Sequence, residues 1–97
     1  MSLTKEIEEG NIEYKRYLCN LEPYKIERLI SQMRWRIVEG EGEAIYYLGV
    51  NDNGTIFKMS DEQKEETLKN FNIIVEKSNA TIVSIEMSDY IKAIIRF

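Results

Sequence analysis

The sequence predicts an α+β domain in which two helices pack on one mainly antiparallel sheet, in the order β-α-β-β-α-β-β. Three observations support this two-layer sandwich. The middle of the chain reads as a hairpin, two segments have the hydrophobic period of helices, and shorter segments near both ends alternate as strands do. Each element therefore has one apolar face to bury against the other layer.

The central stretch Glu43–Ser60 predicts a strand, a tight turn, a second strand and the start of a helix. Two apolar runs, Ala44–Val50 and Thr55–Met59, flank the turn Asn51–Gly54. The Asn-Gly pair in that turn is a strong signal for a type I′ hairpin, which needs positive φ at both central positions. The serine that closes the stretch is followed three residues later by Gln63, as in a capping box.

Two helices are predicted at Pro23–Val38 and Asp61–Lys77. Proline is well placed at a first helical position, and acidic residues at the start and a lysine at the end suit the helix dipole. Asn79 is placed to end the second helix in a left-handed conformation. The predicted inner stripes follow the i, i+3, i+4 pattern. They are Ile26, Leu29, Ile30, Met33 and Ile37 in the first helix, and Leu68, Phe71, Ile74 and Val75 in the second.

Three more strands are predicted at Asn11–Cys19, Thr81–Met87 and Tyr90–Phe97, because their apolar residues alternate with polar ones. In the first of them, Glu13 and Lys15 fall on the side opposite the apolar residues. The side chains expected to face the core are Ile12, Tyr14, Leu18, Val83, Ile85, Met87, Ile91, Ala93, Ile95 and Phe97.

The composition is that of a soluble globular domain. The 97 residues are 43% hydrophobic and 31% charged, with a net charge of −4 that argues against general binding to nucleic-acid backbones. The first residues are polar, and no segment is apolar enough for a signal peptide or a membrane span. We expect a flexible segment over 1–10 and one domain over 11–97. The single cysteine fits a reducing compartment, so we expect a cytoplasmic protein.

The sequence offers little for catalysis. It has no histidine, and it contains neither a phosphate-binding GxxxxGK[ST] loop nor a GxGxxG or GxSxG motif. With one cysteine and no histidine, a zinc site is not expected. We therefore predict that the chain is not an enzyme by itself and holds no cofactor.

The outer face of the first predicted helix is the candidate partner-binding site. At 100° per residue, Trp35 points almost opposite the inner stripe, and Arg28, Gln32 and Arg36 flank it. Tryptophan among arginines is the composition of an interface hot spot, and it could also stack on a nucleotide base. The structural alternative is that the ring of Trp35 is buried in the core, as large aromatic residues often are.

Other polar clusters have simpler explanations. The glutamates at 39, 41 and 43 could hold Mg²⁺ but read better as a solvated, glycine-punctuated loop. The Asn51–Gly54 segment resembles half of a calcium loop, yet turn chemistry explains it. Tyr46 and Tyr47 alternate in one strand, so one of the two faces the open side of the sheet. Tyrosines on an open sheet can stack bases, although the RNP sequence of RRM domains is absent.

Three strings of the sequence resemble a known family. They are GNIEYKRYL, RLISQMRWRIVEGEGEAIYYLGVNDNGTIF and MSDEQKEETLKNFNIIVEKSNATI, and together they span Gly10–Ile82. These strings resemble the region that precedes the G domain in the archaeal and eukaryotic GTP-binding protein one/two family, relatives of elongation factor Tu. Lys58 departs from the pattern, because we expect a glycine of the family at this position. If that glycine allows a close backbone approach or a partner contact, Lys58 puts the contact in doubt.

The resemblance implies a non-catalytic N-terminal accessory domain of an elongation-factor-like GTPase. The sites for GTP and Mg²⁺ would then lie in the parent protein, outside this chain. The implied partners are the G domain of the same protein, the ribosome or tRNA, or another protein. A sheet edge left unpaired would also permit a dimer.

A second, more distant likeness is to Schlafen/Alba-like domains, on Glu13-Tyr14-Lys15 and the later Gly49–Gly54 hairpin. It implies a self-standing nucleic-acid-binding module as the alternative function. The two hypotheses differ in one cheap observation, because only the second expects salt-dependent binding of this chain alone to RNA or DNA.

Overall fold

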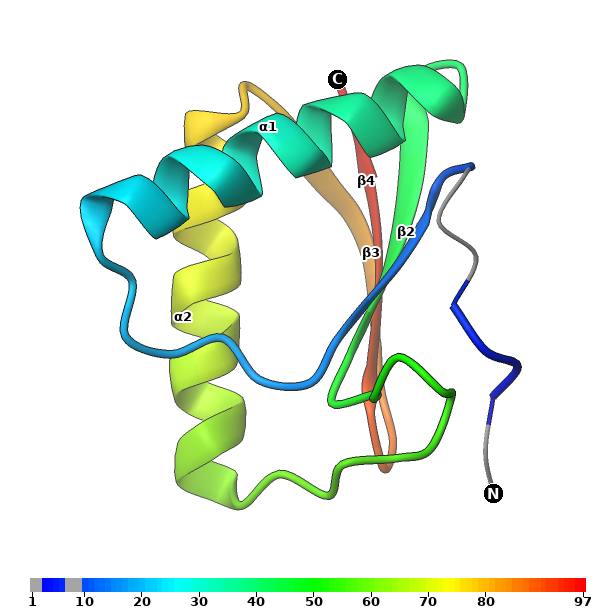
Figure 1. The fold of residues 1–97 in the computed structure, drawn as a ribbon, viewed down its shortest axis with the longest axis vertical. Helices are drawn as coiled ribbons and strands as arrows, with labels where there is room; N and C mark the ends of the chain where they lie inside the picture. The colour runs from blue at the N-terminus through cyan, green and yellow to red at the C-terminus, as the bar shows by residue number, and fades with distance from the viewer. Residues whose placement is uncertain (1–2, 7–9) are drawn as a thin grey trace.

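The structure, a computed structural model, describes residues 3–6 and 10–97. Two helices cover one face of a four-stranded sheet (Figure 1), which confirms the two-layer α+β class. The elements follow one another as β1 (Ile12–Lys15), α1 (Pro23–Glu39), β2 (Glu43–Leu48), α2 (Asp61–Lys77), β3 (Thr81–Met87) and β4 (Ile91–Arg96).

The strands lie in the order β1-β2-β4-β3, so β1 and β3 form the two edges of the sheet. β1 and β2 are parallel, and α1 is the crossover that such a pair requires. β4 pairs antiparallel with both β2 and β3. The prediction of a mainly antiparallel sheet is confirmed, and the parallel pair β1–β2 was not foreseen.

The helices begin and end close to where local signals place them. Pro23 opens α1, and the backbone N–H of Gly40 closes it. At the start of α2 the hydroxyl of Ser60 accepts from the N–H of Gln63, whose side chain accepts from the N–H of Ser60, which confirms the capping box. Asn79 follows α2 with φ of 58°, the left-handed conformation expected of it.

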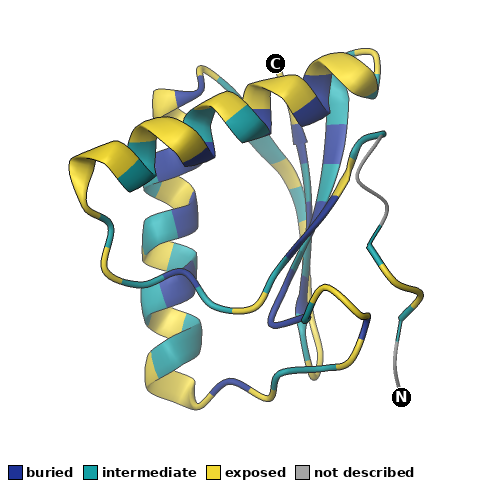
Figure 2. Ribbon diagram, viewed as in Figure 1, coloured by how far each residue is buried: buried dark blue, intermediate teal, exposed yellow. Residues whose placement is uncertain are grey.

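The core lies between the sheet and the inner faces of the helices (Figure 2). Both inner stripes were predicted from periodicity, and all nine of their residues lie in or against the core, six of them buried. The fully buried apolar residues include Leu29, Met33, Ile37, Ala44, Tyr46, Leu48, Phe71, Ile74, Val75, Ile91, Ala93 and Ile95.

The turn after β2 is not the predicted type I′ turn. Only Gly54 has positive φ, at 90°, and Asn53 does not. The side-chain oxygen of Asn53 accepts from the N–H of Thr55 at 3.0 Å and from its hydroxyl at 2.6 Å. This local bonding is formed with Asn53 outside the positive-φ region, and turns without the type I′ geometry splay the two arms of a hairpin.

The predicted strand at Thr55–Met59 is absent as a result. A single bridge joins Val50 to Ile56, and the N–H of Phe57 donates to the carbonyl of Gly49 at 2.9 Å. The segment then runs to the N-terminus of α2 without joining the sheet. The two-layer class holds with one strand fewer than the predicted order.

β1 is shorter than the predicted Asn11–Cys19, because the chain leaves the sheet after Lys15 and turns toward α2. The side chain of Asn70 donates to the carbonyl of Leu18 at 2.9 Å, and the hydroxyl of Tyr17 donates to Glu66 at 2.5 Å. These bonds tie the connection before α1 to the side of α2.

Four side chains expected in the core are exposed, namely Val83, Ile85, Met87 and Phe97, and Ile12 is on the border of exposure. β3 is an edge strand with a bulge at Val83, so its outer side has no neighbouring strand among the described residues. The ring of Phe97 lies 5.0 Å from the guanidinium of Arg34 on the surface. Alternation alone does not distinguish an edge strand from a central one.

The segment 3–6 lies beside the turn after β2. The N–H of Leu3 donates to the carbonyl of Gly54 at 2.6 Å, and the N–H of Glu6 donates to that of Asp52 at 2.8 Å. Residues 1–2 and 7–9 of the predicted flexible segment lie outside the described residues, and the flexibility of 1–10 stays a prediction.

Candidate functional site

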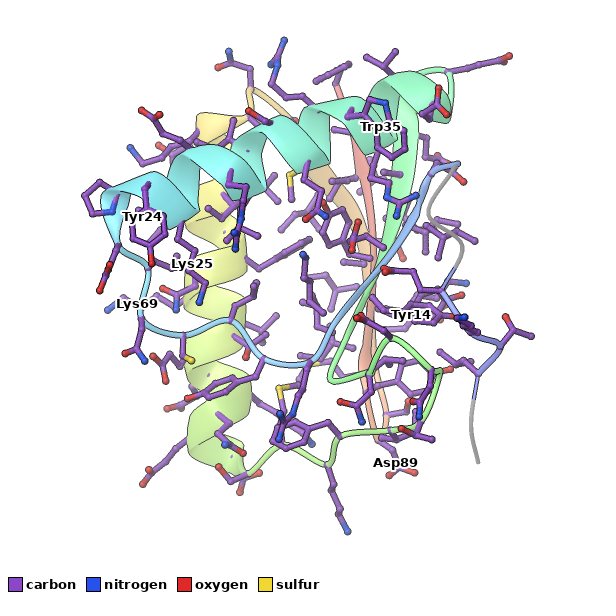
Figure 3. The ribbon with its side chains drawn as sticks, viewed as in Figure 1. Tyr14, Tyr24, Lys25, Trp35, Lys69 and Asp89 are labelled. Atoms are coloured by element: carbon purple, nitrogen blue, oxygen red, sulfur yellow. The ribbon has the colours of Figure 1, made fainter. Side chains whose placement is uncertain are left out.

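The outer face of α1 carries exposed apolar side chains beside polar ones (Figures 2 and 3). Tyr24, Trp35 and Val38 are exposed there, and Trp35 keeps 45% of its surface accessible. The exposed Arg28 and Ser31 lie between them in sequence. At 100° per residue these five fall within about 80° of the helix circumference, so they form one stripe. We call these residues the α1 stripe.

The structure decides between the two interpretations of Trp35. The ring lies on the surface of α1 instead of in the core (Figure 3). Arg28 is exposed and Gln32 is half-buried at the border of the same face. Three of the four predicted site residues therefore come together as the helix period indicates. Their role in binding a partner stays a prediction.

Arg36 lies elsewhere than the sequence analysis placed it. Its side chain is only 3% exposed and points toward β1, not outward. The Nε atom lies 2.8 Å from Oε1 of Glu13, and Nη1 donates to the carbonyl of Gly10 at 2.9 Å. The placement of Arg36 on the outer face was wrong, because an ion pair and a backbone carbonyl hold its guanidinium inside.

Arg36 still acts on the surface through Trp35. Its guanidinium carbon lies 5.1 Å from the centre of the Trp35 ring, within range of a cation–π contact. The guanidinium of the buried Arg36 thus lies over the exposed ring and packs against it. A ring held in one orientation loses less entropy on binding than a free one, which suits a recognition residue.

Glu13 is a buried charged side chain that the sequence analysis placed on the wrong side of its strand. It is 2% exposed and lies on the helix side of β1, where it pairs with Arg36 and, at 3.6 Å, with Lys15. Its neighbour in the sheet is the buried Tyr46. A buried carboxylate needs charged or hydrogen-bonding partners, and here the arginine one turn before the end of α1 supplies them.

A second cluster of aromatic residues lies on the open face of the sheet. The ring of Tyr47 lies 5.6 Å from that of Tyr14 and 5.7 Å from that of Tyr90. Tyr14 is buried, and its hydroxyl donates to the carbonyl of Thr4 at 2.6 Å. Tyr46 packs against Phe71 in the core, as the alternation of the two tyrosines predicts. With Tyr14 covered, the row offers less free ring surface than the α1 stripe does.

The remaining polar clusters keep their simple explanations. Within residues 3–6 and 10–97, no three acidic, cysteine or histidine side chains are placed to hold a metal ion. Cys19 is a free, half-buried thiol. Among the described helices, none is long and apolar enough to cross a membrane.

The α1 stripe has exposed aromatic side chains beside an arginine, a composition that is common in interface anchors. Comparison with known proteins gives a more particular result. The mouse and human GTP-binding protein 2 sequences are each 45% identical to this chain over 80 residues, which is 82% of the chain. An uncharacterized protein of Acanthamoeba polyphaga mimivirus is 39% identical over 77 residues, which is 78% of this chain and 41% of that protein.

The chain spans only 13% of the length of the mouse and human relatives. It is therefore similar to one segment of a GTP-binding protein. No family model matches the chain, and no solved structure matches it.

Proposed function

We propose that this chain is a non-catalytic interaction domain of an elongation-factor-like GTP-binding protein. One observation carries the proposal, the 45% identity over 80 residues to a segment of GTP-binding protein 2. The sequence has no GxxxxGK[ST] loop, so the residues that bind GTP and Mg²⁺ belong in this proposal to another part of the parent protein. Its place of action is the cytoplasm.

The α1 stripe is the proposed contact surface, and the G domain of the same protein is the partner that we favour. Trp35 supplies a planar apolar anchor, and Arg28 supplies a guanidinium group that can bind a carboxylate with two hydrogen bonds. Gln32 adds a donor and an acceptor at the border of the stripe. Arg36 contributes by holding the Trp35 ring, so it is a positioning residue in this proposal.

Titration calorimetry of this chain with the remainder of the parent protein tests the proposal. We expect Trp35→Ala and Arg28→Glu each to weaken binding at least about tenfold, since each removes an anchor. Lys69→Glu makes the same charge change on the exposed face of α2 and serves as the control. Trp35→Ala should change the free energy of unfolding by less than about 1 kcal/mol, because the ring lies at the surface.

The same variants separate the alternatives. If Trp35→Ala and Arg28→Glu weakened binding no more than Lys69→Glu does, the α1 stripe would not be the contact surface. Binding of the chain alone to single-stranded RNA, with an affinity that falls as salt rises, would support the Schlafen/Alba-like alternative. The acidic net charge of −4 favours the protein partner over nucleic acid.

A further inference from the structure

The two edge strands of the sheet differ in whether another segment bonds to their outer side. At the β1 edge, the backbone N–H of Tyr14 donates to the carboxylate of Glu6 at 2.5 Å. At the β3 edge, no segment of the chain that the structure describes pairs with the strand on its outer side. An edge strand left open in this way presents a row of N–H and C=O groups to any strand that fits.

Three of the five exposed residues of β3 are apolar. Val83, Ile85 and Met87 are 53%, 41% and 57% exposed, and the strand carries a single charge at Glu86. β3 has no proline and no lysine, the residues that usually protect an edge from pairing. Exposed apolar residues on an open edge are typical of an interface between strands.

The helix side of β3 has room for the side chains of an added strand. Ile85 and Met87 pair in register with the buried Ala93 and Ile91, so both point toward the helix layer while remaining uncovered. At the beginning of β3, a groove between this strand and α2 is lined by Asn72, Val75, Glu76, Ala80, Thr81 and Ile82. A strand placed beside β3 would cover both places.

We propose that β3 pairs antiparallel with β3 of a second copy of this chain, about a two-fold axis at Ile85. In this register Ile85 faces Ile85 of the other copy, and each Met87 lies opposite the bulge at Val83. Glu86 faces Ser84, so the only charge of the strand does not meet its own copy. The same symmetry brings the Met87 side chain of each copy toward the groove at the start of the other copy's β3.

The self-complementary order of residues identifies the occupant. A two-fold interface requires that each residue be compatible with its symmetry mate, and the pairs Ile85–Ile85 and Ser84–Glu86 meet this requirement. The bulge at Val83 confines the regular edge to Ser84–Met87. Because so short an edge buries less than a standard interface, the dimer should be weak, with a Kd in the micromolar range or above. This surface is separate from the α1 stripe and does not depend on its function.

Sedimentation equilibrium of the 97-residue chain over a range of concentrations tests the dimer. We expect concentration-dependent association that Ile85→Lys weakens at least about tenfold, because two lysines would meet at the two-fold axis. Ile12→Lys places the same charge on an exposed isoleucine of β1, at the opposite edge of the sheet, and should leave association unchanged. Circular dichroism establishes that each variant is folded.

Mixing two variants gives the decisive measurement. Ile85→Lys and Ile85→Glu should each be monomeric alone, and an equimolar mixture should regain association, because lysine then faces glutamate at the axis. Neither loss of folding nor pairing with an unrelated strand predicts this recovery. A wild-type chain that stays monomeric to about 1 mM would overturn the proposal, since even a weak interface associates there. If the dimer persisted in Ile85→Lys but was lost in Trp35→Ala, the interface would lie on α1 and the β3 proposal would be wrong.

Discussion

The guanidinium of Arg36 and the carboxylate of Glu13 form a buried ion pair, with Nε and Oε1 2.8 Å apart. The pair joins the C-terminal half of α1 to the edge strand β1. The same guanidinium lies against the ring of Trp35, so one arginine serves both the packing of the helix and the shape of the candidate surface. A substitution there should therefore affect stability first and recognition second.

Removing one member of this pair should destabilise the domain strongly. Arg36→Ala leaves the Glu13 carboxylate buried without its main partner, and such changes cost about 3–5 kcal/mol of unfolding free energy. Urea unfolding followed by circular dichroism measures the cost. The double variant Glu13→Leu/Arg36→Met should recover most of the loss, because neither side chain then carries an uncompensated charge.

The exposed pair of Arg96 with Glu43 is the matched control. Its Nε–Oε1 distance is 3.8 Å and both side chains are largely in water. Arg96→Ala should cost no more than about 0.5 kcal/mol. Equal losses for Arg36→Ala and Arg96→Ala would contradict the special role of the buried pair.

Trp35 should report a positively charged, water-exposed environment by fluorescence. It is the only tryptophan, so the emission comes from one site. We expect a red-shifted maximum and quenching by iodide that exceeds quenching by caesium ions, because Arg28 lies on the same stripe. Arg28→Ala should reduce this preference for the anion. A blue-shifted emission that resists both quenchers would instead place the ring in an interface or in the core.

Local signals predicted the helices well because they act over a few residues. Pro23 at the start of α1 and the Ser60–Gln63 capping box each fix a helix end without reference to the rest of the fold. The inner stripes follow for the same reason, since the helix period alone determines which side chains share a face.

The strands were predicted less well because their faces depend on distant partners. The alternation around Glu13 shows that two sides differ, but not on which side the helices lie. Glu13 lies on the helix side because it pairs with Arg36, which is 23 positions later in the chain. The edge position of β3 likewise depends on the order of all four strands, so Ile85 and Met87 looked like core residues.

Gly54 should be intolerant of a side chain for two reasons. Its φ of 90° strains any other residue, and a Cβ atom would collide with the backbone of Leu3. Gly42 has a similar φ of 108° but open space around it. Gly54→Ala should therefore lower the free energy of unfolding by more than Gly42→Ala, by about 1 kcal/mol or more. Thermal unfolding of the two variants measures the difference, and equal losses would show that Leu3 does not pack on Gly54.

The carboxyl group of Glu6 should make stability depend on pH. Burial, and then the neighbouring carboxyl of Glu13, raise the pKa of Glu6 from 4.5 to about 7, although the N–H of Tyr14 donates to it and acts in the opposite direction. In the unfolded chain this carboxyl ionises near its ordinary value. Between pH about 4.5 and 7 the folded state therefore binds more protons than the unfolded state, so stability falls as pH rises.

Glu6→Gln should flatten this dependence. Glutamine resembles the protonated acid and removes the repulsion between the two carboxylates, so the variant should be more stable than wild type at pH 8 and nearly equal to it at pH 4.5. Urea unfolding at several pH values measures both curves. Glu65→Gln, on an exposed position of α2, should leave the slope unchanged. If Glu6→Gln were instead less stable at pH 8, the ionised carboxylate would be the form that holds 3–6 against β1, because its bond from the N–H of Tyr14 would then outweigh burial.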